Sequence, residues 1–256
     1  MQTLLDTIPP QVPCVLHIDL KAIQENYLSL KGFVRKGALC AAVLKADAYG
    51  LGQNAIGDAL YKVGCRDFFF AYVDEAIQAR KHFPNKNIDL YVFNGVLPRT
   101  EDCFIEHNLI PCLISKEQVE RWAHHAQHLS QKLPCLLHVD TGMGREGLPD
   151  DVLKEVVQGD LLENLDIRYI MSHMANSNNS GSLKNKIQLD RFLKARQLLP
   201  KTKASLATFA NSSGIALGDT YQFDLVRPGM ALYGYKNESY STLLDLKPCL
   251  KTFARI

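Results

Sequence analysis

Residues 41–52 read AAVLKADAYGLG, an apolar run that ends in a lysine and passes directly into a turn. The apolar part, residues 41–44, is too short for a helix and predicts an interior strand. One aspartate and two glycines supply turn chemistry after the lysine, before a helical pattern resumes at residues 55–63. Lys45 is therefore expected where a buried strand leaves the core. Such a lysine is either a solvated surface residue or a chemical reagent.

The same alternation of short β-rich runs and longer amphipathic stretches continues along the chain, as is typical of βα units around a parallel sheet. Eight or nine such units in roughly 230 residues match the size of a (β/α)8 TIM-type barrel, although an open doubly wound α/β sheet has the same alternation. The expected strands are residues 14–18, 38–44, 67–73, 88–93, 109–114, 134–139, 167–172, 205–210 and 225–234. The expected helices include residues 19–35, 74–83, 115–131 and 186–198, with Asp19, Asp74 and Ser115 as N-terminal caps.

The character of the sequence changes after Gly234. Residues 10–235 are expected to form the barrel. Residues 236–256 begin as a polar, turn-rich linker and then alternate like a strand up to Ile256. This stretch predicts the start of a truncated second, β-rich domain. The first residues have neither a basic start nor a sustained apolar core, so we expect no signal peptide or membrane span.

The composition favours a small-molecule ligand. Lys plus Arg is 29 and Asp plus Glu is 27, so no large positive excess indicates a nucleic-acid or membrane partner. The seven cysteines are odd in number and scattered without a Cys-x-x-Cys pair, which favours reduced thiols in a cytoplasmic protein over disulfides or a zinc site. His124 and His128 are four residues apart, but a solvated helix face explains them better than a metal site does.

Polar residues follow several expected strands, at the end where barrel enzymes carry their functional groups. Singly, a lysine, a histidine or an Asn-Ser pair at a strand end is most often structural or solvated. Together they would face one barrel mouth. These residues are Lys45, Asp140 with Arg145, His173, Asn211 with Ser212, and Arg227, which is expected to open the last strand.

A lysine becomes a base or a Schiff-base former when desolvation or a neighbouring cation lowers its pKa. Schiff-base chemistry with a phosphorylated cofactor also needs a phosphate cradle. Ser212 at a helix start, the backbone around Gly229 and the hydroxyl of Tyr49 could provide one.

Five ordered blocks extend this hypothesis: AAVLKADAYGLG, HVDTGMGR, SHMANS, FANSSG and VRPGMALYG, which span residues 41–234. In this order they resemble the N-terminal barrel domain of alanine racemase, a pyridoxal-phosphate enzyme. The resemblance covers nearly the whole chain. It implies an isomerase that interconverts L- and D-alanine, supplies D-alanine for peptidoglycan, and works in the cytoplasm as a homodimer without a metal.

The resemblance also implies roles for individual residues. Lys45 would carry pyridoxal phosphate as a Schiff base and act as a base on one face of the substrate Cα. Arg227 would approach the pyridine nitrogen and, being always protonated, would keep that nitrogen from gaining its own proton. Arg145 would touch the phenolic oxygen of the cofactor, and His173 would belong to the polar chain around the opposite-face base. Tyr49, Ser212, Gly229 and Met230 would hold the phosphate, and Asn211 completes the cofactor-binding set.

Three departures from the family pattern stand out. His138 occupies the position of a lysine that is often carbamylated and orients the arginine, so Arg145 would need another partner, such as a bound anion or His138 itself. Thr208 replaces a histidine and could bond to Arg227 with a shorter reach. The tyrosine that serves as the second base belongs to the C-terminal domain, and nothing in residues 235–256 matches its context. The hypothesis is therefore a chain that binds pyridoxal phosphate but has little racemase activity alone.

Two alternatives remain open. The first is a single-domain pyridoxal-phosphate-binding homeostasis protein without racemase activity. The second, weaker alternative is an NAD-dependent dehydrogenase, because Gly142, Gly144 and Gly147 satisfy G-x-G-x-x-G after a strand. That motif needs a helix directly behind it, whereas Pro149 stands where the helix should already be running.

Overall fold

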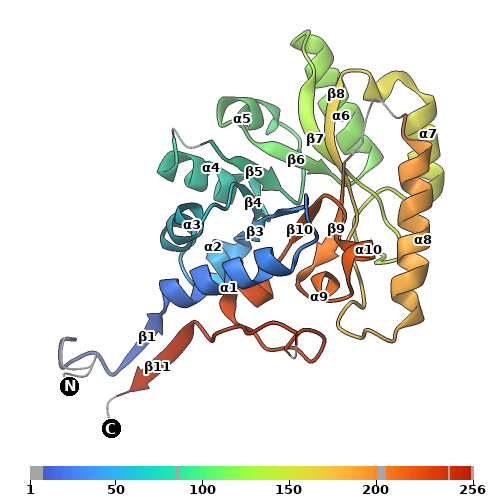
Figure 1. Ribbon diagram of the computed structural model, residues 1–256. Helices are drawn as coiled ribbons and strands as arrows, with labels where there is room; N and C mark the ends of the chain where they lie inside the picture. Colours follow the sequence, from blue (N-terminus) through green and yellow to red (C-terminus); the bar gives the residue numbers. More distant parts are fainter. Residues whose placement is uncertain (1–7, 85–86, 201–205, 242, 255–256) are drawn as a thin grey trace.

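A ring of parallel strands forms the centre of the protein, and helices pack around it (Figure 1). The computed structural model describes residues 8–84, 87–200, 206–241 and 243–254. Each neighbouring pair of strands in the ring is parallel, and the ring closes because β2 pairs with β10 while β3 pairs with β4. The ring strands are β2 (Leu39–Cys40), β3 (Ala42–Val43), β4 (Asp67–Phe70), β5 (Asp89–Val92), β6 (Ile110–Leu113), β7 (Leu133–His138), β8 (Leu165–Met171), β9 (Ala207–Asn211) and β10 (Leu225–Arg227).

This architecture confirms the predicted (β/α)8 barrel over the open sheet. β2 and β3 are one strand of the barrel, interrupted at Ala41, so the ring has eight strand positions. Side chains within a strand alternate between the interior and the helices, as β4 illustrates. Phe69 lies in the cluster that fills the barrel, whereas Phe68 and Phe70 lie in the outer core. Both faces are buried, which explains why the strands are continuously apolar in the sequence.

The helices cover the outside of the barrel. Asp19 caps the first helix by accepting a hydrogen bond from the Ala22 N–H at 3.0 Å, and Ser115 accepts one from the Gln118 N–H at 3.4 Å, as predicted. Asp74 is not a cap, because its helix already begins one residue earlier. The helices are α1 (Leu20–Phe33), α2 (Lys45–Gly50), α3 (Gln53–Lys62), α4 (Val73–His82), α5 (Glu101–Glu106), α6 (Lys116–His128), α7 (Asp150–Gln158), α8 (Leu183–Leu198), α9 (Ser212–Ile215) and α10 (Asp219–Gln222), with 3-10 turns η2 (Asp160–Leu162) and η3 (Met230–Tyr233).

The first predicted strand exists but lies outside the barrel. β1 (Cys14–Ile18) pairs antiparallel with β11 (Leu250–Ala254), and the two form a separate two-stranded sheet that projects from the barrel (Figure 1). β11 confirms the strand expected near the end of the chain, although residues 255–256 lie outside the described part. Residue 205 of the strand predicted at 205–210 lies outside it as well.

The strand predicted at residues 225–234 is too long. β10 ends at Arg227, which therefore closes this strand instead of opening it. Pro228 has no N–H to donate to a strand ladder, and the chain turns into η3 two residues later. Arg227 before Pro228 and Gly229 after it both lie at the mouth of the barrel.

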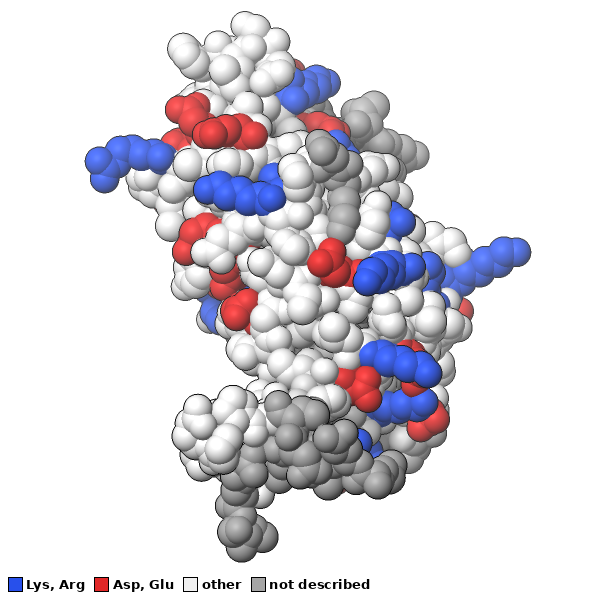
Figure 2. All heavy atoms as spheres, turned by 90° about the vertical axis from the view of Figure 1, so that its left-hand side faces the viewer, with Lys and Arg blue, Asp and Glu red and all other residues white. Residues whose placement is uncertain are grey.

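Figure 2 shows acidic and basic side chains interspersed on the face it displays. Five of the seven cysteines are buried, as expected for small apolar core residues. His124 and His128 are exposed on α6, and no cluster of three metal-ligating side chains occurs in the described residues. None of the helices in the described ranges is long and apolar enough to cross a membrane.

Candidate functional site

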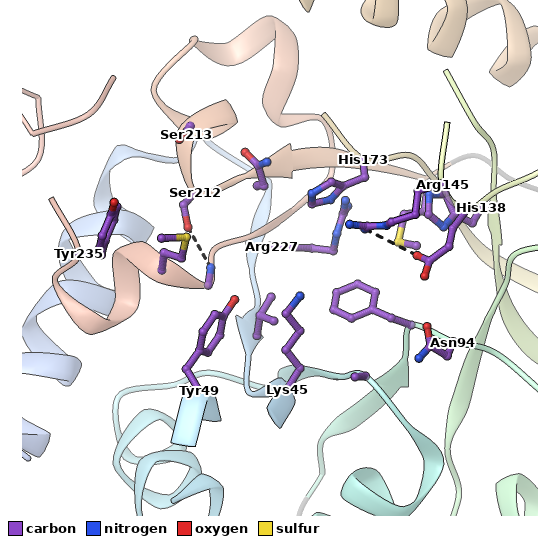
Figure 3. Close-up of a pocket in the computed structure, with 18 of the residues that line it drawn as sticks. Lys45, Tyr49, Asn94, His138, Arg145, His173, Ser212, Ser213, Arg227 and Tyr235 are labelled. Atoms are coloured by element: carbon purple, nitrogen blue, oxygen red, sulfur yellow. Dashed lines mark hydrogen bonds and ion pairs between the residues drawn. The ribbon is translucent and has the colours of Figure 1, made fainter. Parts of the chain in front are cut away.

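The carboxyl ends of the barrel strands surround a pocket of about 520 Å³ (Figure 3). Among the described residues, its lining contains three basic side chains, one carboxylate and several hydroxyl groups. The basic side chains are those of Lys45, Arg145 and Arg227. All nine site residues expected from the sequence line this pocket: Lys45, Tyr49, Arg145, His173, Asn211, Ser212, Arg227, Gly229 and Met230.

Lys45 enters the pocket through an unusual turn. The four residues from Ala46 to Tyr49 all have positive φ, between 52° and 61°, so they form one left-handed helical turn. Each L-residue in this conformation costs roughly 1–2 kcal/mol, and such strain persists only when the surroundings enforce it. The turn brings Tyr49 beside Lys45 on one side of the pocket (Figure 3). The sequence indicated a turn here, but it gave no sign of this handedness.

Opposite these two side chains, a set of hydroxyl and backbone groups forms a small cradle. The Ser212 hydroxyl accepts hydrogen bonds from the Gly229 N–H at 3.0 Å and the Ala231 N–H at 3.2 Å. A Cβ added to Gly229 would lie 2.3 Å from the Tyr49 hydroxyl, so only glycine leaves this space open. Burial raises the pKa of Tyr49, which keeps its hydroxyl a neutral donor.

Asn211 fixes the helix that carries Ser212. Its side-chain oxygen accepts hydrogen bonds from the Gly214 N–H at 2.9 Å and the Ser177 hydroxyl at 2.8 Å. Asn211 is thus the N-terminal cap of α9 and a link to the loop after β8. Ser212 begins this helix, as expected.

Arg227 is a buried cation whose partners in the described residues are neutral. The guanidinium donates to the Thr208 hydroxyl, to the Ser172 carbonyl at 2.7 Å and to the Phe209 carbonyl at 3.4 Å. Thr208 in turn donates to the Leu225 carbonyl at 2.7 Å. Burial lowers the pKa of Arg227 to about 10, so it stays protonated at neutral pH. The prediction that Thr208 bonds to Arg227 is confirmed.

The two histidines of the pocket are neutral. Burial, reinforced by the positive charge of Arg227, lowers the pKa of both His138 and His173 to about 3. His138 is 4% exposed, and its Nδ1 has no hydrogen-bond partner among the described residues. A neutral imidazole in this position brings no additional charge to the pocket.

Arg145 has a carboxylate partner that the sequence analysis missed. Its Nη2 lies 3.7 Å from the carboxylate of Glu146, which also lines the pocket (Figure 3). Glu146 is therefore the charged neighbour of Arg145 among the described residues, and it is not one of the partners expected from the sequence. His138 is not among the groups that bond to Arg145 in the described structure. The signal was present in the sequence, because Glu146 is adjacent to the arginine.

The glycine-rich loop before Arg145 folds around Asp140. The Oδ1 of Asp140 accepts hydrogen bonds from the N–H groups of Gly142 at 2.9 Å, Met143 at 2.9 Å and Gly144 at 3.2 Å. A dinucleotide-binding loop would offer such N–H groups to a phosphate. Here a carboxylate already occupies them, and the next helix begins only at Asp150. The loop is therefore built to hold Arg145 at the pocket.

Comparison with known proteins places this geometry in a family. The family model for the N-terminal domain of alanine racemase matches residues 18–237. The chain belongs to the alanine racemase N-terminal domain family. Among curated relatives in this family, the alanine racemase of Brucella ovis is 45% identical over 235 residues, and that of Rickettsia prowazekii is 44% identical over 222 residues. These alignments cover 90% and 86% of this chain but only 57% and 54% of the relatives.

Solved structures agree with this family assignment. The alanine racemase of Bartonella henselae, whose crystal structure contains covalently bound pyridoxal phosphate, superposes with a TM-score of 0.89 at 36% identity. The match covers 96% of this chain and 67% of that one. The alanine racemase of Clostridium difficile has the same fold, with a TM-score of 0.85 at 21% identity over 95% of this chain and 65% of that one.

Several lining residues were not expected from the sequence. They come from the loops after β4 and β5 and from the segment after η3, where the local sequence carries no motif that marks a ligand site. Their position follows from the closure of the barrel, which brings distant loops to one mouth. They include Tyr72, Phe93, Asn94, Tyr235, Asn237 and Tyr240.

Proposed function

We propose that this protein is the barrel part of a pyridoxal-phosphate-dependent alanine racemase. The observation that carries the proposal is the placement of Lys45 at a pocket that also holds a hydroxyl-lined cradle and a buried arginine. A lysine, a phosphate cradle and a group for the pyridine nitrogen are the elements that this cofactor needs. The family match and the 45% identity to curated alanine racemases support the same conclusion.

The residues present fit the cofactor chemically. The gap between Gly229 and Tyr49 is one that a single added Cβ would fill, so the cradle is open only because residue 229 is glycine. Lys45, Arg145 and Arg227 bring positive charge to the pocket against the single described carboxylate of Glu146. This balance suits a ligand that carries a phosphate group.

Each residue then has a role in the proposal. Lys45 holds the cofactor covalently. Arg227 would hold the pyridine nitrogen and Arg145 the phenolic oxygen, and His173 would belong to the polar chain beside them. Tyr49, Ser212, Gly229 and Met230 would hold the phosphate, with Asn211 fixing the helix of Ser212.

When bound, pyridoxal phosphate acidifies the Cα–H of an attached amino acid by drawing its electrons into the ring. After the substrate amine replaces Lys45 on the cofactor, the freed Nζ of Lys45 would remove or return the Cα proton on its own face. Arg227 donates a hydrogen bond without giving up its proton, because its pKa of about 10 keeps it charged while its partners are neutral. This limits electron withdrawal and so favours return of the proton over side reactions.

Racemisation needs an acid–base group on each face of the substrate Cα. The chain spans 57% of the length of its Brucella relative, so the activity of the whole protein is part of the proposal. We assign residues 10–235 to the cofactor-binding barrel, apart from β1, which pairs with β11 outside the ring, and residues 236–256 to a linker and the first strand of a second domain. Lys45 serves one face. The complete protein is proposed to act in the cytoplasm as a homodimer on alanine and to supply D-alanine for peptidoglycan.

The direct test is an absorbance spectrum after addition of pyridoxal phosphate. We expect a visible band from lysine-bound cofactor, which disappears in Lys45→Ala and persists in the matched control Lys62→Ala, an exposed lysine on α3. An unchanged spectrum in Lys45→Ala would remove the basis of the proposal.

A second measurement separates the racemase from a pyridoxal-phosphate-binding homeostasis protein. In D2O, the loaded chain is expected to exchange the Cα hydrogen of one alanine enantiomer faster than it racemises it, because Lys45 acts on one face. Tight cofactor binding without any Cα exchange would favour the homeostasis protein. Racemisation as fast as exchange would show that this chain already holds both bases.

A further inference from the structure

Three barrel helices carry a polar side chain that bonds to the loops after two neighbouring strands. Gln118 on α6 donates to the Asn94 carbonyl at 2.9 Å and accepts from the Ile114 N–H at 3.1 Å. Gln188 on α8 donates to the His173 carbonyl at 3.0 Å and the Thr141 hydroxyl at 3.2 Å, and it accepts from the Ala175 N–H at 2.9 Å. In both, one amide supplies a donor to one group and an acceptor to another.

The third bridge differs in its chemistry. Glu75 on α4 accepts a hydrogen bond from the Ala46 N–H at 2.9 Å through Oε1. Its Oε2 accepts from the Ala71 N–H at 2.8 Å and from the Tyr72 N–H at 3.4 Å. Both ends of this bridge are donors, so only a side chain with two acceptor oxygens can satisfy them. A carboxylate is therefore required here, whereas an amide suffices at the other two bridges.

The Ala46 end of the bridge is the decisive one. Ala46 follows Lys45 directly and is the first residue of the left-handed turn, with φ of 53°. This strained turn sets the direction in which the Lys45 side chain leaves the backbone. The other end of the bridge belongs to the loop after β4, where Ala71 and Tyr72 also line the pocket.

A second contact fixes Glu75 itself. The side chain of Gln53 donates to the Glu75 carbonyl at 3.1 Å, and the Gln53 N–H donates to the Asp47 carboxylate at 2.8 Å. Asp47 lies inside the left-handed turn, so the turn is tied to α4 from both sides. Glu75 thus bonds to the turn directly, through the Ala46 N–H, and indirectly, through Gln53 and Asp47.

We propose that Glu75 is a positioning residue for the cofactor lysine. Its carboxylate holds the backbone N–H after Lys45 and the loop after β4 in one arrangement. This arrangement would aim the Lys45 amine at the aldehyde carbon of pyridoxal phosphate, where a C=N bond would form and the aldehyde oxygen would leave as water. The proposal rests on the function proposed above. Glu75 is not among the described residues that line the pocket, so its effect is on the geometry of attachment.

The test compares Glu75→Gln with the unaltered protein. An amide keeps one acceptor but turns N–H groups toward the other donor, so one end of the bridge opens. We expect the rate of covalent attachment to Lys45 to fall by about ten-fold or more, the range for loss of a hydrogen bond to a charged group. The attached fraction is followed by visible absorbance and by borohydride reduction with mass analysis of the Lys45 peptide.

Two control variants separate positioning from general stability. Asp74→Asn removes a neighbouring exposed carboxylate on the same helix turn. Gln118→Ala breaks a bridge of the same kind two helices away. Both are expected to attach the cofactor at the original rate, although Gln118→Ala lowers the unfolding midpoint in urea. If Gln118→Ala slows attachment as much as Glu75→Gln does, the effect is one of stability and the proposal fails.

If Glu75→Gln does not fold, Glu75→Asp carries the test, since it retains the carboxylate but is too short to reach both loops. Attachment at the original rate in a folded Glu75→Gln or Glu75→Asp overturns the positioning role. Absence of attachment in the unaltered protein overturns the proposed function instead, so the two failures are distinct.

Discussion

Asp67 lies at the end of the barrel opposite the pocket, where it is the first residue of β4 and is 8% exposed. Asp89 of β5 is its direct partner in the strand register. The Tyr91 hydroxyl donates to Asp67 at 3.1 Å and lies 3.4 Å from a carboxylate oxygen of Asp89. Burial first, and then the negative charge of Asp89, raise the pKa of Asp67 from 3.8 to about 6. We predict that Asp67→Asn stabilises the protein at high pH.

The sign follows from proton binding. The folded state keeps a proton on Asp67 that the unfolded chain has lost, so the free energy of unfolding falls as pH rises from 3.8 to about 6 and stays low above it. The shift of about two pKa units corresponds to about 3 kcal/mol. Asparagine removes the charge but keeps an oxygen for the Tyr91 hydroxyl. Asp67→Asn is therefore expected to gain about 3 kcal/mol at about pH 8 and under about 1 kcal/mol at about pH 4.

Equilibrium urea unfolding of the cofactor-free chain, followed by circular dichroism at both pH values, measures this difference. The matched control is Asp166→Asn, which removes an aspartate whose side chain is 49% exposed and lies 2.8 Å from Arg168. Such surface pairs contribute less than about 1 kcal/mol, so the control should follow the original pH dependence. The reasoning is refuted if Asp67→Asn unfolds with the same pH dependence as the unaltered protein, or is less stable at about pH 8.

Two further predictions concern the pocket. Gly229→Ala places a Cβ 2.3 Å from the Tyr49 hydroxyl, so the phenol must move, and we expect roughly ten-fold weaker pyridoxal-phosphate binding in an absorbance titration. The loss of affinity should be smaller when Tyr49→Phe is also present. An equal loss of affinity with and without Tyr49→Phe would contradict the steric account. Thr208→Val removes the hydroxyl that accepts a hydrogen bond from Arg227, so the free energy of unfolding in urea should fall by about 1.5–3 kcal/mol. An unchanged free energy of unfolding would mean that the buried guanidinium finds another acceptor.

The sequence predicts the barrel well because its strands are buried on both faces and its helices are amphipathic. Both patterns are local, so they appear in windows of a few residues. The role of residues 14–18 could not be predicted in this way. Their antiparallel partner lies at residues 250–254, and a pairing over that sequence distance leaves no periodic signal. The end of β10 was predictable, since Pro228 alone indicates that the ladder stops there.

That the nine expected residues line one pocket was predictable because barrel strands deliver functional groups at one end and because five motifs carried the resemblance. The geometry of the lysine turn was not. Alanine, aspartate and tyrosine in residues 46–49 give no local reason for four positive φ angles, which only glycine adopts readily. The first N–H of the turn, that of Ala46, donates a hydrogen bond to Glu75, which lies almost 30 residues away in the sequence. Propensity cannot detect a conformation that depends on a distant carboxylate.

The charges around the pocket explain why arginine, and not histidine, faces the ring nitrogen in this proposal. With pKa values of about 3, His138 and His173 stay neutral down to about pH 4, and Arg227, with a pKa of about 10, stays charged up to about pH 9. The positive charge of Arg227 helps to keep the two histidines neutral, because after burial it is the second cause that lowers both of their pKa values. Any pH dependence of cofactor attachment in this interval must therefore arise outside these three side chains. Across this pH interval the guanidinium of Arg227 is therefore a charged hydrogen-bond donor, and the two imidazoles beside it stay uncharged.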